Sequence, residues 1–337
     1  MTLYVGVSRS RRNLRFPQSG GLCLVPRQIS KTALLFAGQG AQFVGMGKDF
    51  AEHFPTAKAW FTKANEVLGC DLAKVCFEGP EAELTNTENA QPAIYLASWV
   101  AFEVLKEQVP ELEFCATAGL SLGEFTALAA AGAVSFEEGL RVVRQRGRFM
   151  QEACEATQGG MAAIIGLEES KTRDVCQSVG VTVANLNCPG QIVISGPAHL
   201  MEKACEAAKA AGAKKAMPLK VAGAYHSPLM SSAQPKLRQA LGAIHFRPPQ
   251  VPVISNVTAR PHGSSSETID RLVDQVTASV RWEESIQQLL AQGVTRFIEL
   301  GPGKALSGFL KRITDQARVL NVGDVPSLQA AVQALKG

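Results

Sequence analysis

Ser121 stands between two glycines where the sequence changes from an apolar run to a helix-like segment. The five residues read Gly119-Leu-Ser-Leu-Gly123, and residues 114–118 precede them as a short buried strand. Strand, turn and helix in this order are the context in which Gly-x-Ser-x-Gly forms a nucleophile elbow. The glycines allow a sharp turn that exposes Ser121, while the N–H of Leu122 points toward a developing oxyanion. A chance turn without chemistry is the alternative.

A serine nucleophile needs a base, and the sequence offers five histidines: His53, His199, His226, His245 and His262. His226 is the best placed of them. It lies in the loop Ala222-Gly-Ala-Tyr-His-Ser-Pro228, where the chain returns from an inserted region to the main sheet. We therefore predict that His226 is the general base. An ordinary loop histidine, held by a main-chain hydrogen bond, is the alternative.

Arg146 is a cation on an otherwise semi-apolar helix face. Ser135 and Glu138 form a capping box that starts this helix. The stripe follows at i, i+4, i+7 and i+11: Val142, Arg146, Phe149 and Ala153. A guanidinium among apolar neighbours seeks a carboxylate or phosphate, and its planar fork suits a carboxylate. Arg146 is therefore a candidate for binding an acidic substrate, or else a buried arginine paired with a structural acid.

Gln39 lies between two glycines after another apolar run, residues 32–37. No Gly-Lys-Ser/Thr follows this loop, and it is not part of a Gly-x-Gly-x-x-Gly run, so we expect no nucleotide site. Gln39 could aim an amide at a cleft. A solvated glutamine in a tight turn is the alternative.

Alternating strands and helices predict the sheet that positions these residues. Four apolar runs read as strands: 32–37, 114–118, 294–300 and 318–322. Helical patterns lie between them, at 91–108 and in the segment that ends at Arg312. This alternation predicts an α/β fold with a parallel sheet that the first and last parts of the chain share.

The middle of the chain has a different order of predicted strands and helices. It reads strand, helix, strand, strand, helix, strand over residues 161–167, 168–179, 181–187, 191–195, 197–211 and 214–219. That order is the ferredoxin-like pattern. We therefore predict a parallel-sheet, α/β-hydrolase-like large subdomain, residues 31–156 and 224–330, with an inserted ferredoxin-like small subdomain, residues 157–223. A cleft between the two is expected.

Composition and charge narrow the possible partners. The chain has 337 residues, of which 46% are hydrophobic and 19% charged. Residues 1–48 hold seven bases and no acid, so the net charge of +4 leaves residues 49–337 at −3. A slightly acidic body gives no reason to expect nucleic acid. The longest uncharged stretch, residues 175–201, has too many polar side chains to cross a bilayer, so we expect no membrane partner.

The cysteines and the N-terminal segment add further expectations. None of the eight cysteines belongs to a Cys-x-x-Cys pair or has a histidine at ligand spacing, so we expect no metal. We also expect no cofactor. Residues 1–30 suit a disordered or targeting extension, or a mis-assigned start. We expect a monomer in the cytoplasm of a bacterial-type cell. A plastid or mitochondrion is the alternative if residues 1–30 are a transit peptide.

Six dispersed motifs resemble those of the malonyl-CoA:acyl-carrier-protein transacylase family. In order they are Phe36-Ala-Gly-Gln-Gly-Ala-Gln42, Gly119-Leu-Ser-Leu-Gly-Glu124, Arg146-Gly-Arg-Phe-Met-Gln151, Asn185-Leu-Asn-Cys-Pro-Gly-Gln191, Gly223-Ala-Tyr-His-Ser227 and Glu299-Leu-Gly-Pro-Gly303. The resemblance runs from about residue 32 to residue 322. Two positions depart from the family pattern: Leu120 stands where histidine is usual, and Ala37 where proline is common.

The resemblance implies a reaction as well as a fold. Malonyl-CoA would donate its malonyl group to Ser121, and the phosphopantetheine thiol of acyl carrier protein would then receive it, to supply fatty acid biosynthesis. His226 would take the serine proton. Gln39 and the Leu122 amide would hold the oxyanion.

The same resemblance implies roles for residues that bind or orient. Arg146 would pair with the free malonyl carboxylate. Asn185 and Asn187 would lie near the bound thioester. A main-chain carbonyl around Arg281 would orient His226.

Two other functions remain open from the sequence. A serine hydrolase (a thioesterase or esterase) of the α/β-hydrolase type shares the elbow and uses Ser, Asp/Glu and His in that order. Asp174 is an acid between Ser121 and the candidate base. A non-catalytic carrier-protein-binding module would follow if Leu120 disabled the elbow. Arg146 and Gln39 favour the transacylase, because a plain esterase does not require them.

Overall fold

The computed structural model describes residues 31–336, so the expected N-terminal extension, residues 1–30, lies outside the described residues. The strands are β1 (Lys31–Phe36), β2 (Ala116–Gly119), β3 (Gly159–Ile165), β4 (Thr182–Cys188), β5 (Gln191–Pro197), β6 (Lys215–Pro218), β7 (Val253–Ile254), β8 (Val280–Arg281), β9 (Val294–Leu300) and β10 (Arg318–Val322). The α-helices are α1 (Lys48–His53), α2 (Pro55–Leu68), α3 (Leu72–Glu78), α4 (Glu81–Thr85), α5 (Thr87–Gln108), α6 (Gly123–Ala130), α7 (Phe136–Ala156), α8 (Glu169–Val179), α9 (Met201–Ala210), α10 (Ala233–Gly242), α11 (Ser265–Asp274), α12 (Trp282–Ala291), α13 (Ala305–Ile313) and α14 (Val325–Lys336). None of these helices is long and apolar enough to span a membrane.

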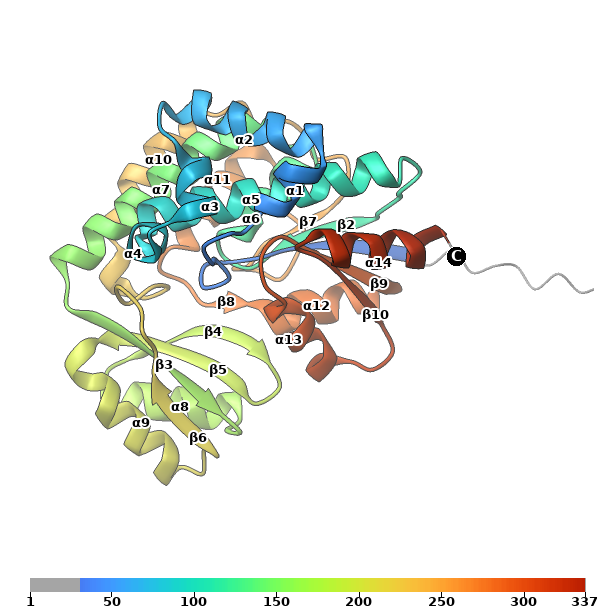
Figure 1. Cartoon of the computed structure of the whole chain (residues 1–337). Coiled ribbons are helices and arrows are strands. Elements are labelled where there is room, and N and C mark those ends of the chain that lie inside the picture. The colour runs from blue at the N-terminus through green and yellow to red at the C-terminus, as the bar shows by residue number, and fades with distance from the viewer. Residues whose placement is uncertain (1–30, 337) are drawn as a thin grey trace, which may run out of the picture.

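Strand β1 is buried on both faces, which explains its unbroken apolar sequence. Ala33 and Leu35 face a cluster that includes residues of α12 and α13. Leu34 and Phe36 face the larger cluster, to which α2, α5 and α7 contribute. Successive side chains of a strand point to opposite faces, so the sheet needs helices on both sides. Figure 1 shows α2 and α5 above the large sheet and α12 and α13 below it.

The large sheet has the strand order β10-β9-β1-β2-β7, and each pair of neighbours in it is parallel. This confirms the predicted α/β fold with a parallel sheet that both ends of the chain share. Phe36 pairs with Gly119 and with Leu300, so these strands finish at the same edge. The loops that carry Gln39 and Ser121 leave the sheet there, at the carboxyl ends where α/β proteins bind ligands.

The second sheet has the order β6-β3-β5-β4-β8 and packs against α8 and α9. It lies apart from the large sheet, at the lower left of Figure 1. Strands β3 to β6 follow the predicted order with α8 and α9 and pair in antiparallel fashion. Strand β8 was not predicted, and it pairs in parallel with β4. Because β8 lies at residues 280–281, a distant part of the chain completes this sheet.

Some element boundaries differ from the predicted ones for local reasons. Helix α5 begins earlier than predicted, at Thr87, because Asn86 caps it by accepting a hydrogen bond from the N–H of Glu88 at 3.0 Å. The second helix of the small sheet, α9, begins later than predicted. Pro197 still belongs to β5, and a 3-10 turn (Ala198–Leu200) separates it from α9.

Candidate active site

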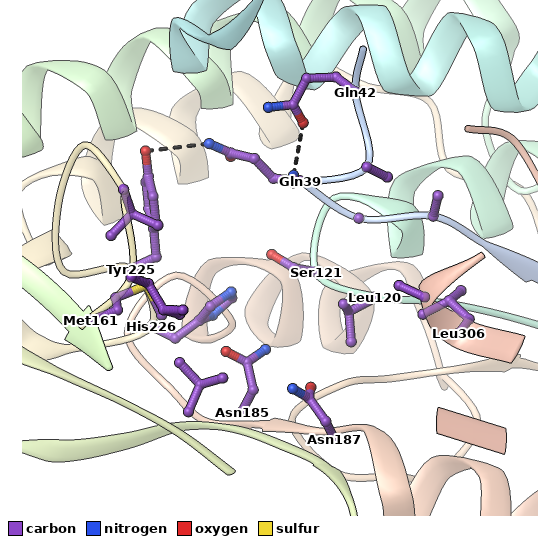
Figure 2. A pocket seen from close by; sticks show the side chains of 18 of the residues that line it. Gln39, Gln42, Leu120, Ser121, Met161, Asn185, Asn187, Tyr225, His226 and Leu306 are labelled. Atoms are coloured by element: carbon purple, nitrogen blue, oxygen red, sulfur yellow. Dashed lines mark hydrogen bonds between the residues drawn. The ribbon is translucent and has the colours of Figure 1, made fainter. Parts of the chain in front are cut away.

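A cavity of about 810 Å³ opens between the two sheets. Gln39 and Ser121 line it from loops of the large sheet, Asn185 and Asn187 line it from β4, and His226 lines it from the loop after β6. Figure 2 shows these side chains around one space. The other predicted site residues are not part of the lining: Leu122, Arg146 and Arg281.

Ser121 occupies a strained turn that its neighbouring glycines permit. Its φ is 52°, a left-handed value that is uncommon for a residue with a side chain. A Cβ on Gly119 would lie 1.9 Å from the carbonyl carbon of Gly123, and one on Gly123 would lie 2.2 Å from the carbonyl oxygen of Phe36. Glycine is therefore required on both sides of the serine. The turn between β2 and α6 has the geometry of a nucleophile elbow.

His226 is buried, and a main-chain carbonyl holds its ring. Nδ1 lies 2.8 Å from the carbonyl oxygen of Gln275. Because a carbonyl oxygen can only accept, Nδ1 carries the proton and Nε2 keeps a free electron pair. Burial, together with the nearby Arg146 guanidinium, lowers the pKa of His226 to about 4. The ring is therefore neutral at neutral pH, as a general base must be.

The carbonyl that orients His226 is not the predicted one. It belongs to Gln275, the C-cap of α11, where the last carbonyls of a helix have no partner inside the helix and can accept from elsewhere. Arg281 has other roles. Its N–H donates to the carbonyl oxygen of Asn256 at 2.9 Å, and its guanidinium pairs with Glu284. The assignment of Arg281 is therefore corrected to Gln275.

Arg146 is buried behind Ser121 on α7, the helix that begins with the predicted capping box. Its Nη1 donates to Oε1 of Gln91 at 2.6 Å. Its Nη2 donates to Oε1 of Gln275 at 2.9 Å and to Oγ of Ser121 at 3.1 Å. No carboxylate hydrogen-bonds to the guanidinium within residues 31–336, and the nearby Glu124 carboxylate acts on it through its charge without contact. Burial lowers the pKa of Arg146 to about 10, which leaves it charged at neutral pH.

Two main-chain N–H groups are free in the loops that carry the elbow and Gln39. Neither the N–H of Gln39 nor that of Leu122 has an acceptor in the part of the chain that the structure describes. The side-chain amide of Gln39 is engaged elsewhere. It donates to the hydroxyl of Tyr225 at 3.3 Å and accepts from Gln91 at 3.4 Å, and Figure 2 shows the first of these bonds. Free main-chain N–H groups are what an oxyanion requires.

Asn185 and Asn187 lie two residues apart on β4, so their side chains share one face of the strand. Both point toward the cavity in Figure 2. Both are buried, and Oδ1 of Asn187 has no hydrogen-bond partner among the described residues. A buried amide oxygen without a donor is unfavourable. A ligand that brings an N–H group would therefore bind favourably here.

The residues that hold these groups in place were not predicted from the sequence. Glu124, Asn256 and Gln275 form buried hydrogen bonds around the elbow, and Gln91 binds the buried guanidinium. Glu124 had a signal, because it ends the motif that contains the serine. Asn256 and Gln275 lie 135 and 154 residues from Ser121, and neither has a local pattern that marks it.

This arrangement suits acyl transfer, because the serine can attack, the histidine can take its proton and the free N–H groups can hold an oxyanion. The sequence pattern of the acyl transferase domain matches residues 33–334, and the chain belongs to this family. The resemblance to the malonyl-CoA:acyl-carrier-protein transacylases is thereby confirmed, as named relatives and solved structures show.

Two curated relatives illustrate the similarity. The malonyl CoA-acyl carrier protein transacylase of Bacillus subtilis (strain 168) is 47% identical over 313 residues, which cover 91% of this chain and 98% of that protein. The transacylase of the same name from Escherichia coli (strain K12) is 39% identical over 309 residues, which cover 90% of this chain and 100% of that protein.

Solved structures have the same fold over most of the chain. The acyl-carrier-protein-S-malonyltransferase from Bartonella henselae gives a TM-score of 0.87 at 39% identity, with 91% of this chain and 100% of that one covered. A malonyl-transacylase solved in complex with its type II PKS acyl-carrier protein gives a TM-score of 0.88 at 39% identity, with 90% and 100% covered.

Proposed function

We propose that the chain transfers the malonyl group of malonyl-CoA to the phosphopantetheine thiol of an acyl carrier protein, through a malonyl ester on Ser121. The observation that carries the proposal is the buried guanidinium of Arg146, 3.1 Å from Oγ of Ser121 and without a carboxylate partner in residues 31–336. A buried cation with no carboxylate in contact favours an acyl group that brings its own carboxylate. The product, malonyl-acyl carrier protein, would supply fatty acid biosynthesis.

The chemistry of the first half-reaction follows from the site. Nε2 of His226 takes the proton as Oγ of Ser121 attacks the thioester carbonyl carbon. The oxyanion forms within reach of the N–H groups of Gln39 and Leu122. Collapse of the intermediate breaks the C–S bond, and the thiol of CoA leaves with the proton from the histidine. The carrier thiol then attacks the ester by the reverse sequence, so two easier transfers replace one difficult step.

Arg146 links substrate binding to activation of the nucleophile. It now donates to Oγ of Ser121, and no hydrogen bond joins that oxygen to His226 in residues 31–336. A malonyl carboxylate would compete for the same Nη2 donor. Once the guanidinium turns to the carboxylate, Oγ is free to bond with Nε2 of His226. Asn185 and Asn187, on the opposite wall, would hold the thioester arm.

Two observations favour transfer over the other candidate functions. A hydrolase triad would orient His226 with an acid, but a carbonyl does so here, and Asp174 is exposed on α8 of the small sheet. A binding module would have no need of the left-handed turn at Ser121, since strained conformations persist where function requires them. Leu120 leaves that turn in place.

We also propose the finer division of the fold and the setting of the protein. The strand order β6-β3-β5-β4 and the separate apolar cluster with α8 and α9 support a ferredoxin-like small subdomain of residues 157–223. The elbow after a parallel strand supports an α/β-hydrolase-like large subdomain of residues 31–156 and 224–330. A monomer suffices, because one chain supplies the whole cavity. The bacterial relatives favour the cytoplasm, and a plastid or mitochondrion would apply if residues 1–30 are a transit peptide.

Intact-mass measurement after incubation with malonyl-CoA tests the proposed function. The parent chain should gain one malonyl group and pass it to added phosphopantetheinylated acyl carrier protein. Ser121→Ala should gain none, whereas Ser231→Ala, which removes an exposed serine, should be labelled like the parent. Release of malonate with no labelled carrier would identify a hydrolase. A parent chain that is never labelled would leave only the binding module.

A further inference from the structure

The carboxylate of Glu124 is completely buried beneath the elbow and has a hydrogen-bond partner on each oxygen. Oε2 accepts from the N–H of Asn256 at 2.9 Å and from Nε2 of Gln275 at 2.8 Å. Oε1 lies 2.6 Å from Nε2 of His262. These three partners come from two segments of the chain, the loop after β7 and the end of α11. One side chain therefore joins both segments to the start of α6.

Asn256 connects Glu124 to the nucleophile. Its side-chain Oδ1 accepts from the N–H of Ser121 at 2.6 Å, and its Nδ2 donates to the carbonyl oxygen of Gly119 at 2.8 Å. These two bonds hold the left-handed residue Ser121 and the residue two positions before it, Gly119. The main-chain N–H of Asn256 is bound to the Glu124 carboxylate. The carboxylate therefore sets the position of the Asn256 side-chain amide, which is hydrogen-bonded to the elbow.

Gln275 connects Glu124 to the other two reactive groups. Its side chain donates to the carbonyl oxygen of Ser121 at 3.0 Å and accepts from Arg146 at 2.9 Å. Its main-chain carbonyl accepts from Nδ1 of His226 at 2.8 Å. A shift of Gln275 would therefore move the nucleophile, the base and the guanidinium together. The bond from its Nε2 to Glu124 opposes such a shift.

Among the described residues, the ring of His262 has a single hydrogen-bond partner, Glu124. The pair is buried, with 1% of the His262 side chain and none of the Glu124 side chain exposed. Because a carboxylate accepts, Nε2 of His262 donates. Nδ1 is also buried and has no hydrogen-bond partner in the described part of the chain. Nε2 of His262 thus supplies the donor for Oε1 of Glu124, a buried oxygen that would otherwise have none.

We propose that Glu124 and His262 form a positioning pair for acyl transfer: the Glu124 carboxylate holds Asn256 and Gln275 in place, and His262 holds the carboxylate. This inference rests on the proposed function. Neither residue touches the substrate or the reacting atoms. Their effect reaches the reaction through Ser121, because a displacement of about 1 Å at reacting groups can slow catalysis about 100-fold.

Two substitutions of His262 separate positioning from packing. His262→Gln keeps an N–H donor at a similar distance from the main chain, and His262→Leu keeps a similar volume without a donor. The measurement is the single-turnover rate of acylation by malonyl-CoA and by acetyl-CoA. We expect His262→Gln to stay within about threefold of the parent and His262→Leu to slow malonyl transfer about 10–100-fold. The malonyl-to-acetyl ratio should fall about tenfold in His262→Leu, because Arg146 is displaced as well.

A purely structural role predicts a different result. It would lower the thermal midpoint and leave the rate per folded chain and the malonyl-to-acetyl ratio unchanged, and that outcome would overturn the proposal. Equal losses in His262→Gln and His262→Leu would overturn it too.

Glu124→Gln tests the pair if His262→Leu does not fold. The amide oxygen can accept from Asn256 and Gln275, and the amide nitrogen can donate to Nε2 of His262 once that ring changes tautomer. We therefore expect this variant to fold and to lose about 3–10-fold in malonyl transfer as the charge is removed. Full activity with an unchanged ratio would overturn the proposal. A parent chain that takes up no malonyl group would overturn the proposed function itself, which is a separate and visible result.

Discussion

The two walls of the cavity differ in what their unbonded polar groups are suited to bind. On the side of the large sheet, hydrogen bonds hold the main chain of Ser121, the ring of His226 and, behind the cavity lining, the guanidinium of Arg146. The N–H groups of Gln39 and Leu122 have no acceptor among the described residues and are free for an oxyanion. On the wall built by the small sheet, Oδ1 of Asn187 has no partner among the described residues, and Leu219 is 37% exposed. The first wall is organised in advance for developing charge. The second keeps groups free for the bound arm of the substrate.

The largest effect on the rate is expected when the general base is removed from the side of the large sheet. His226→Ala should slow acylation by on the order of 10²–10⁴-fold, as loss of a general base commonly does. Stopped-flow or quenched-flow acylation by malonyl-CoA measures the rate. His199→Ala, an exposed histidine beside the small sheet, is the control and should match the parent. An unchanged rate in the first variant would refute the assignment of the base.

The next largest effect concerns the guanidinium of the same wall. Arg146→Ala removes a buried charge-assisted contact and should lower kcat/KM for malonyl-CoA about 30–1000-fold, or about 2–4 kcal/mol. Transfer from acetyl-CoA should fall little or rise, since that substrate leaves a buried cation unpaired. Arg148→Ala, on an exposed face of the same helix, is the matched control. Equal losses for both thioesters would make Arg146 a structural residue.

A smaller effect is expected on the opposite wall. Asn187→Ala should raise KM for malonyl-CoA about 3–10-fold and leave kcat nearly unchanged, because the side chain contributes binding and no chemistry. Steady-state kinetics with varied malonyl-CoA give both constants. A loss in kcat larger than the rise in KM would mean that Asn187 contributes to the chemical step. The contrast between the two walls would then be wrong.

The pH dependence of acylation should be weak. The pKa of His226 is lowered to about 4, so the ring loses its proton well below neutral pH, and the base is already neutral at pH 5. The rate of acylation should change less than about twofold between pH 5 and pH 7 and fall as the pH drops through about 4. A pH–rate profile with a midpoint near 6.5, the ordinary pKa of histidine, would contradict a buried ring that is hydrogen-bonded to a carbonyl.

The smallest effect tests the corrected assignment of the orienting carbonyl. Arg281→Ala should leave the acylation rate within about twofold of the parent, because Gln275 supplies that carbonyl and the Arg281 side chain forms a half-exposed ion pair with Glu284. The same quenched-flow assay measures it. A loss comparable to that of His226→Ala would restore Arg281 to the machinery of the base.

The sequence predicted those parts of the site that depend on local geometry. Two glycines around Ser121 mark a sharp turn, and the apolar run before them marks the strand that leads into it. Helical spacing and a capping box were enough to set Arg146 apart from its neighbours, and the structure buries it. Each of these signals spans a few residues, so no knowledge of the rest of the chain is needed to see it.

The supporting groups were not predictable in this way, since their roles depend on contacts between distant segments. Gln275 acts because α11 ends there with a free carbonyl and the loop of His226 folds against it. Asn256 acts because it follows a strand of two residues, β7, which is too short for a periodic signal. The misplaced prediction at Arg281 has the same origin: resemblance indicated the segment but not which carbonyl faces the ring.

Strand β8 has a consequence for an exchange of residues 157–223, the proposed small subdomain, between relatives. Its pairing covers the outer side of β4 at Asn185 and Leu186, although β8 lies far along the chain from residues 157–223. If residues 157–223 were grafted into a relative, β4 would therefore pair with the β8 strand of that relative instead of its own. The same piece expressed alone would present a bare strand, which invites association with other chains. A chimera designed to keep this pairing would carry residues 280–281 together with residues 157–223. The segment to exchange is therefore discontinuous in the sequence.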